Sequence, residues 1–176
     1  QEIVEKYQYL SDRAEIDMIG HLQANKIKYI IGKVRMIQSL DSLKLAGEID
    51  KRYRKAGESI DTLLEINIGR EPSKTGIDPA EVGDFLRGIE KFGSLRVCGL
   101  MTVAPALPDK EQVRPYFRRM KEIFDDAKKL NIGNVRMRYL SMGMTGDFEV
   151  AVEEGSNMVR IGTGIFGSRN YKIQRG

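Results

Sequence analysis

The segment "TLLEINI", residues 62–68, decides the fold because its two faces differ in polarity. Successive residues of a strand point to opposite sides, so the apolar residues 64, 66 and 68 share one face. The opposite face turns polar toward the end of the strand, where it carries Glu65 and Asn67. We therefore expect one face to pack on helices and the other to face a partly polar interior.

The segment "NMVRIGTG", residues 157–164, repeats this division. Val159 and Ile161 share an apolar face, whereas Arg160 lies on the other, and we interpret the run as a buried strand. A barrel with helices outside and a polar interior mouth explains both strands. A doubly wound open sheet, covered by helices on both sides, remains an alternative but is expected to be apolar on both faces.

Short β-rich segments alternate with amphipathic stretches along the rest of the chain. The expected strands are 15–22, 34–40, 61–69, 95–103, 137–143 and 157–164, and the expected helices are 1–13, 25–34, 41–57, 78–93, 114–133 and 145–155. This alternation predicts an α/β fold with a parallel sheet.

Capping residues set the expected helix ends. Asp41 is the predicted N-cap of the helix that ends at Gly57. Asp78 is predicted to cap the next helix, with Pro79 in its first position, and Thr145 is expected to open the last one.

The chain has 176 residues, fewer than the about 250 of a usual eightfold barrel. About six strand–helix units are visible, and the chain opens on a helix with no strand before it. We expect a single domain over residues 1–176, incomplete at the N-terminus and lacking the first two strands of a TIM-type (β/α)8 barrel.

The composition is that of a soluble globular protein, with 41% hydrophobic and 31% charged residues and a net charge of +4. No apolar run approaches the ~20 residues of a membrane span, and the basic clusters are too short and interrupted for nucleic-acid binding. The one cysteine, Cys98, is expected to be a small core residue in a reducing compartment, which favours the cytoplasm. Metal-ligand spacings, a catalytic triad order and a P-loop are absent from the sequence.

Two glycine-rich segments, "SMGMTGD" at 141–147 and "RIGTGIFG" at 160–167, follow the last two strands. Barrels often bind a phosphate at the loops after their last strands, where glycines let backbone N–H groups approach an anion. The Ser141 and Thr163 hydroxyls could donate as well. The alternative is that these glycines merely end strands.

Arg160 needs an acceptor, because an arginine on an interior face cannot lose its proton. That acceptor is either an interior carboxylate such as Glu65 or an atom of a ligand. His21, the one histidine, is either a structural hydrogen-bonding residue or a functional one.

Several segments together resemble the pyridoxal phosphate homeostasis protein family, the single-domain relatives of the N-terminal barrel of alanine racemase. They are "IGHLQANK", "QSLDS", "LLEINIGREPSKTG", "GLMTVAP" and "LSMGMTGDFEVAVEEGSNMVRIGTGIFG", and they cover nearly the whole chain in order. The resemblance implies a barrel of the alanine racemase N-terminal type and a site for pyridoxal 5′-phosphate (PLP).

The resemblance also implies roles for individual residues. It places the phosphate at Ser141, Gly162 and Thr163 with backbone help around Met142, Arg160 at the pyridine nitrogen, and Asn67, Met101 and His21 around the ring. An arginine at that nitrogen disfavours its protonation and weakens the ring as an electron sink. The family's Schiff-base lysine lies in a first strand that this sequence lacks, so we expect PLP to bind non-covalently or to be absent.

The leading functional hypothesis is a non-enzymatic PLP-binding protein of intracellular vitamin B6 homeostasis. We expect a cytoplasmic monomer whose partners are PLP and PLP-dependent apoenzymes. The alternative is a PLP-dependent amino-acid racemase of the short single-domain type, with His21 as one base. A third hypothesis is another phosphate-binding barrel, such as a sugar-phosphate enzyme that uses Glu65.

Overall fold

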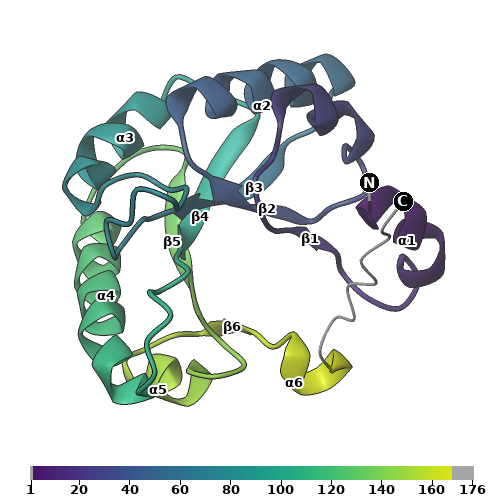
Figure 1. The fold of residues 1–176 in the computed structure, drawn as a ribbon. Coiled ribbons are helices and arrows are strands. Elements are labelled where there is room, and N and C mark those ends of the chain that lie inside the picture. The colour runs from purple at the N-terminus through teal and green to yellow at the C-terminus, as the bar shows by residue number, and fades with distance from the viewer. Residues whose placement is uncertain (1, 168–176) are drawn as a thin grey trace.

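The molecule is built on one curved parallel sheet (Figure 1). Its structure is a computed structural model that describes residues 2–167. Its strands are β1 (Asp17–Met18), β2 (Met36–Leu40), β3 (Ile60–Glu65), β4 (Leu95–Met101), β5 (Val135–Met144) and β6 (Met158–Arg160). They follow one another across the sheet in chain order, and every pair is parallel. The predicted α/β fold with a parallel sheet is confirmed. Gln1 and residues 168–176 of the predicted domain lie outside the described residues.

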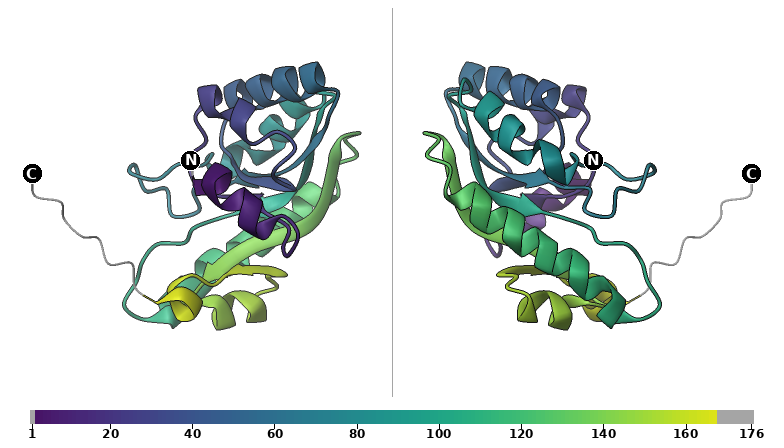
Figure 2. Two further views of the ribbon diagram at one scale, coloured as in Figure 1. Left: turned by 90° about the vertical axis from the view of Figure 1, so that its right-hand side faces the viewer. Right: turned by 90° about the vertical axis from the view of Figure 1, so that its left-hand side faces the viewer.

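Six α-helices and three 3₁₀ helices accompany this sheet within the described residues. They are α1 (Glu2–Leu10), α2 (Leu43–Ala56), α3 (Val82–Ile89), α4 (Arg114–Lys128), α5 (Phe148–Glu153) and α6 (Thr163–Phe166), with 3₁₀ helices η1 (Ala24–Tyr29), η2 (Pro79–Glu81) and η3 (Lys110–Val113). Helices α2 to α5 line the outside of the arc in all views (Figures 1 and 2). The arrangement is that of a partial barrel, not of a doubly wound sheet. No helix within residues 2–167 has the length and apolar character needed to cross a membrane.

The two faces of the sheet carry separate cores. On the helix side, Leu64 and Ile66 are fully buried in a large cluster with residues of α2, α3 and α4. The inner face holds a smaller cluster of Met36, Leu63, Cys98 and Met101, against which Tyr139 and Met158 pack. Each fully buried aliphatic side chain contributes about 1.5–3 kcal/mol. The prediction of two unlike faces for residues 62–68 is confirmed, as is the burial of Cys98.

The strand prediction fails at both edges of the sheet. The first strand comprises two residues rather than the predicted 15–22. The last is not buried, since Val159 is 36% exposed and Met158 and Arg160 are half-buried. The reason is positional, because β6 pairs on one side only within the described residues. An apolar pattern cannot distinguish an edge strand from a central one.

Capping chemistry is confirmed at two helix ends and wrong at the start of α2 and of α5. Gly57 ends α2 in the left-handed region, with φ 72°, and the Asp78 carboxylate caps η2 by accepting from the Ala80 N–H. The N-cap of α2, however, is Ser42 instead of Asp41. Its hydroxyl accepts from the Leu45 N–H at 3.2 Å, three residues on, which is the geometry of a side-chain cap.

Other predicted helices are shorter than expected too: α3 ends at Ile89 instead of residue 93, and α4 ends at Lys128 instead of residue 133. The helix expected over residues 25–34 is the 3₁₀ helix η1, which ends at Tyr29. The helix predicted over residues 145–155, with Thr145 as its first residue, is α5, which begins only at Phe148. Thr145 remains in the preceding loop, where its hydroxyl accepts a hydrogen bond from the Gly164 N–H at 3.2 Å.

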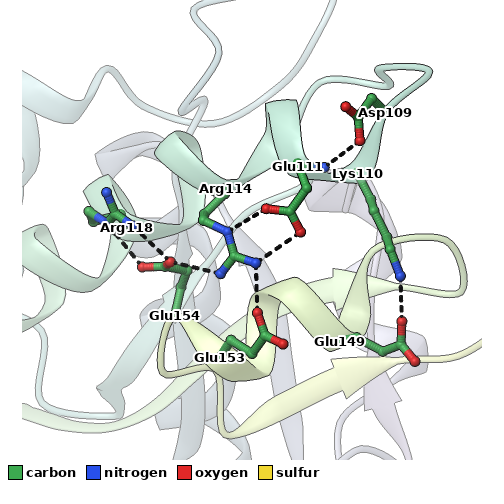
Figure 3. Close-up of polar contacts among 8 residues, drawn as sticks. All are labelled: Asp109, Lys110, Glu111, Arg114, Arg118, Glu149, Glu153 and Glu154. Atoms are coloured by element: carbon green, nitrogen blue, oxygen red, sulfur yellow. Dashed lines mark hydrogen bonds and ion pairs between the residues drawn. The ribbon is translucent and has the colours of Figure 1, made fainter.

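A cluster of charged residues connects α5 and the residue that follows it to η3 and α4 (Figure 3). We call it the outer ion cluster; its members are Lys110, Glu111, Arg114, Arg118, Glu149, Glu153 and Glu154. Arg114 lies at its centre and contacts Glu111 at 2.7 Å, Glu153 at 2.6 Å and Glu154 at 3.0 Å. Since α5 directly follows the loop after β5, these contacts fix the helix that bounds this loop.

Candidate functional site

A continuous row of hydrogen-bonded polar groups crosses the inner face of the sheet. We call it the inner polar chain; its members are Asp17, Arg35, Gln38, Ser141, Arg160 and the Thr102 carbonyl. It begins at Asp17, which accepts from Arg35 Nη2 and from Gln38 Nε2, both at 2.8 Å. It joins side chains from β1, β2, β5 and β6, which are far apart in sequence.

Arg160 forms the far end of this chain. Its Nη1 donates to the Ser141 hydroxyl at 2.6 Å, and its Nη2 donates to the Thr102 carbonyl at 2.6 Å. Ser141 is fully buried and donates in turn to Gln38 Oε1 at 2.8 Å. Both acceptors of Arg160 are therefore neutral groups.

Within residues 2–167 no carboxylate lies at ion-pair distance from Arg160. Burial lowers the pKa of Arg160 below its usual value, and the charges of Asp147 and Glu65 act in the opposite direction. The alternative of a direct Glu65–Arg160 ion pair is therefore not what the structure has. The guanidinium is a cation on the inner face without a contacting negative charge.

Glu65 ends β3 on the same inner face and is 8% exposed. Its Oε1 accepts from the Thr75 hydroxyl at 2.8 Å. Burial raises the pKa of Glu65, and Asp41 adds to the increase, whereas Thr75, Arg160 and His21 oppose it. Glu65 is thus a buried acid held by a neutral donor.

The two glycine-rich loops lie next to each other, as the Gly164–Thr145 hydrogen bond requires. Gly162 is exposed, and a Cβ built there would meet nothing within 4 Å. Thr163 beside it is exposed too. The backbone of the loop after β6 is therefore accessible to a ligand.

The other predicted site residues are placed in different ways. Met101 is buried in the inner cluster, next to Thr102. Met142 is fully buried, but its side chain belongs to the core on the helix side, so only its backbone could contribute. Arg160 and Ser141 are the pair that the structure joins directly.

Asn67 and His21 have partners outside the inner polar chain. The Asn67 amide donates to the Glu71 carbonyl at 2.8 Å and its Oδ1 accepts from the Glu71 N–H at 3.0 Å, so it shapes its own loop. The His21 side chain is 60% exposed, and its Nδ1 lies 3.6 Å from Asp41 Oδ2. It borders a pocket of about 490 Å³ between α1 and η1.

Sequence reasoning missed Gln38, which links the two halves of the inner polar chain. A single amide inside the apolar run "MIQSL" was the available signal, since Gln38 shares the inner face with Met36. It also missed the Thr102 carbonyl, for which a main-chain acceptor leaves no signal in the sequence.

Comparisons with known proteins agree with this architecture. A family model described as alanine racemase, N-terminal domain, matches residues 3–170. A pyridoxal phosphate homeostasis protein of Aquifex aeolicus (strain VF5) is 45% identical over 172 residues, which cover 97% of this chain and 75% of that protein. One from Haemophilus influenzae is 37% identical over 178 residues, covering 99% of this chain and 75% of that protein.

A solved structure is similar over almost the whole chain. PipY of Synechococcus elongatus PCC7942, determined with PLP bound, superposes with a TM-score of 0.83 at 28% identity, over 95% of this chain and 78% of PipY. The family match and both homeostasis proteins cover the segments that build the sheet, the inner polar chain and the two loops. The chain therefore belongs to the pyridoxal phosphate homeostasis protein family, which has the fold of the alanine racemase N-terminal domain.

Proposed function

We propose that this chain binds PLP without catalysing turnover and so contributes to vitamin B6 homeostasis. The observation that carries the proposal is the guanidinium of Arg160, whose hydrogen-bond partners among residues 2–167 are the neutral groups of Ser141 and Thr102. A partly desolvated cation without a counter-charge costs free energy. A bound group with an unprotonated ring nitrogen or a phosphate would supply the missing acceptor.

The residues present fit such a ligand. Arg160 would meet the ring nitrogen, and its position is fixed by the Ser141 hydroxyl at 2.6 Å. The exposed backbone at Gly162 and Thr163, with that of Met142 next to Ser141, would meet the phosphate. Met101, Asn67 and His21 stay assigned to the surroundings of the ring.

The same arginine favours binding of PLP over catalysis with it. PLP supplies an electron sink when its ring nitrogen is protonated, and a permanent cation at that position opposes protonation. Lys74, in the loop after β3, is a charged donor that pairs with Glu71 at 2.6 Å. We therefore propose that binding is non-covalent and that dialysis removes PLP.

The wider role is part of the proposal. We place the chain, as one PLP-binding barrel domain and a monomer, in the cytoplasm, where PLP-dependent apoenzymes would receive the cofactor. The family name and the buried, unpaired Cys98, which suits a reducing compartment, support this placement.

Equilibrium titration of the purified chain with PLP, followed by absorbance, tests the binding site. Arg160→Gln keeps a polar side chain but loses the cation, and we expect its Kd for PLP to rise about tenfold or more. The matched control is Arg136→Gln, an exposed arginine on the neighbouring strand β5, which should bind like the parent chain. Equal affinities for all three proteins would overturn the assignment of Arg160.

A second measurement separates holder from racemase. Exchange of the α-proton of L- and D-alanine in D₂O is expected not to exceed that of free PLP when the chain is added. Exchange well above this background, lost in His21→Ala, would support the racemase alternative.

A further inference from the structure

A small pocket lies at the loop that follows β3. Its volume is about 270 Å³, and it is lined by Glu65, Ile66, Asn67, Ser73, Lys74, Thr75 and Val103. It adjoins the inner polar chain, since Val103 follows Thr102 and the charge of Arg160 influences Glu65. Asn67, which lines the pocket, is also assigned to the surroundings of the PLP ring, but none of the charged groups of the pocket is required by the proposed PLP contacts.

The first charged group is Glu65, which is only 8% exposed. Its Oε1 accepts from Thr75, but within the described residues its Oε2 has no donor. No lysine or arginine of that part of the chain lies at ion-pair distance from it either. Because Oε2 is not one of the fully buried atoms without a partner, it opens toward the pocket, where a positively charged donor would be its strongest partner.

The second charged group is Lys74, whose side chain is 28% exposed. Its Nζ lies 2.6 Å from Glu71 Oε1 and donates to the Ala104 carbonyl at 3.1 Å. An ammonium has three donors, so one remains for a ligand. The pocket thus contains a carboxylate oxygen, Glu65 Oε2, that has no donor among the described residues. It also contains the ammonium of Lys74, which has one N–H group still available.

The frame of the pocket is rigid. The Asn67 N–H donates to the Ile77 carbonyl at 3.0 Å, and the Ile77 N–H donates to the Glu65 carbonyl at 2.9 Å, which closes the loop on itself. Gly76 takes φ +106°, and a Cβ there would lie 2.7 Å from the Asn67 nitrogen. A prearranged frame reduces the ordering cost of binding.

We propose that this pocket binds a small α-amino acid as its zwitterion, with the ammonium at Glu65 and the carboxylate at Lys74. Two opposite charges lining one small cavity match the two charges of such a molecule. The volume lies below the about 300–1,000 Å³ typical of sites for drug-sized ligands, so a short side chain is favoured. The inference does not depend on the proposed function, because neither contact involves PLP.

The probe for the test is L-alanine, titrated without PLP and followed by NMR chemical shifts of backbone amides. We expect saturable shifts at residues 65–67, 73–75 and 103. L-Lactate, which carries a hydroxyl in place of the ammonium, should bind about tenfold more weakly or worse, since a charge-assisted hydrogen bond is lost.

Two variants address the two charges. Glu65→Gln is isosteric, retains an acceptor for Thr75 and removes the negative charge, and Lys74→Met removes the ammonium. Each should raise the Kd for L-alanine about tenfold. The matched controls are Glu81→Gln in η2 and Lys51→Met in α2, both exposed and outside the pocket, which should bind as the parent chain does.

A pH series adds a readout that does not depend on folding of a variant. Glu65 faces the charges of Asp41, Arg160 and His21, and it must be ionised to receive an ammonium. The affinity of the parent chain for L-alanine should therefore increase as pH rises through the raised pKa of Glu65, and Glu65→Gln should show no such increase.

Equal binding of L-alanine and L-lactate would overturn the proposal, as would parent-like affinity in both Glu65→Gln and Lys74→Met. Arg160→Gln provides the separation from the proposed function. If that variant loses PLP but retains L-alanine, the two sites are distinct. If PLP binding proves absent from the parent chain, the L-alanine result is unaffected.

Discussion

Two arginines of this molecule, Arg114 and Arg160, lie in opposite electrostatic surroundings. Arg114, at the centre of the outer ion cluster, contacts three carboxylates, and hydrogen bonds to Glu111, Glu153 and Glu154 raise its pKa (Figure 3). Arg160, at the end of the inner polar chain, has neutral acceptors alone in the described part of the protein, and burial lowers its pKa.

The difference teaches how to separate structural from functional charge. An arginine that joins two helices has its acceptors built into the chain, on a surface where water would accept its hydrogen bonds equally well. An arginine held on the inner face by neutral groups is oriented but not neutralised. Its missing counter-charge is therefore a better indicator of a ligand than its burial alone.

The largest effect on stability should come from breaking the inner polar chain at its middle. Ser141→Ala leaves Gln38 Oε1 without its donor and removes one acceptor of Arg160. We expect the free energy of unfolding to fall by about 1–3 kcal/mol, measured by urea denaturation. Ser73→Ala, at an exposed serine, is the control. If the free energy of unfolding of Ser141→Ala equals that of the parent protein, the inner polar chain contributes no net stability.

Replacing the inner cation should have a smaller effect on stability. Arg160→Leu removes two hydrogen bonds but also a desolvated charge, so the free energy of unfolding should change by no more than about 1 kcal/mol in either direction. Affinity for PLP should nevertheless be lost. A loss of stability well beyond this range would show that Arg160 serves the fold rather than a ligand.

Acid should affect the two regions in opposite directions. The pKa of Glu65 is raised above its ordinary value of 4.5, so its charge destabilises the folded state at neutral pH. That cost disappears as pH falls through its folded pKa, and the stability of the parent chain should approach that of Glu65→Gln. Urea denaturation at a series of pH values measures the difference, and a gap that widens on acidification would contradict this sign.

In the outer ion cluster, by contrast, paired arginines and lysines lower the pKa of Glu111, Glu149 and Glu154. Their stabilisation is present above the ordinary glutamate pKa and is lost as pH falls through the lowered values. This loss lies at more acidic pH than the relief at Glu65. It explains why the two regions can be distinguished in one titration series.

The smallest effect is expected from the outer ion cluster at neutral pH. Arg114→Gln breaks several contacts, but these lie at the surface, where solvent and salt weaken them. The melting temperature should fall only slightly, and high salt should abolish the difference from the parent chain. A difference that persists at high salt would assign Arg114 a packing role instead.

The sequence predicted the parts of the fold that depend on local pattern. The unlike faces of residues 62–68, the left-handed Gly57 and the cap at Asp78 follow from alternation and backbone chemistry, and all three are confirmed. The boundary at Asp41 was wrong because two neighbouring residues could both cap, and only backbone geometry selects Ser42.

Long-range features were harder to predict. The exposure of Val159 depends on which strand lies at an edge, and the importance of Gln38 depends on Ser141, 103 residues away. Arg160 could be recognised because a permanent cation in an apolar run demands an acceptor. Its acceptors could not, because one of them is a main-chain carbonyl.

The strand order has a consequence for how the molecule forms. Because each described strand pairs with the strand just before it in the chain, every crossover spans a short stretch of sequence. Loop closure is then inexpensive at each step, and the sheet can grow strand by strand as the polypeptide leaves the ribosome. The inner polar chain is the exception, since it is completed only when β6, the last of the described strands along the chain, places Arg160 beside Ser141.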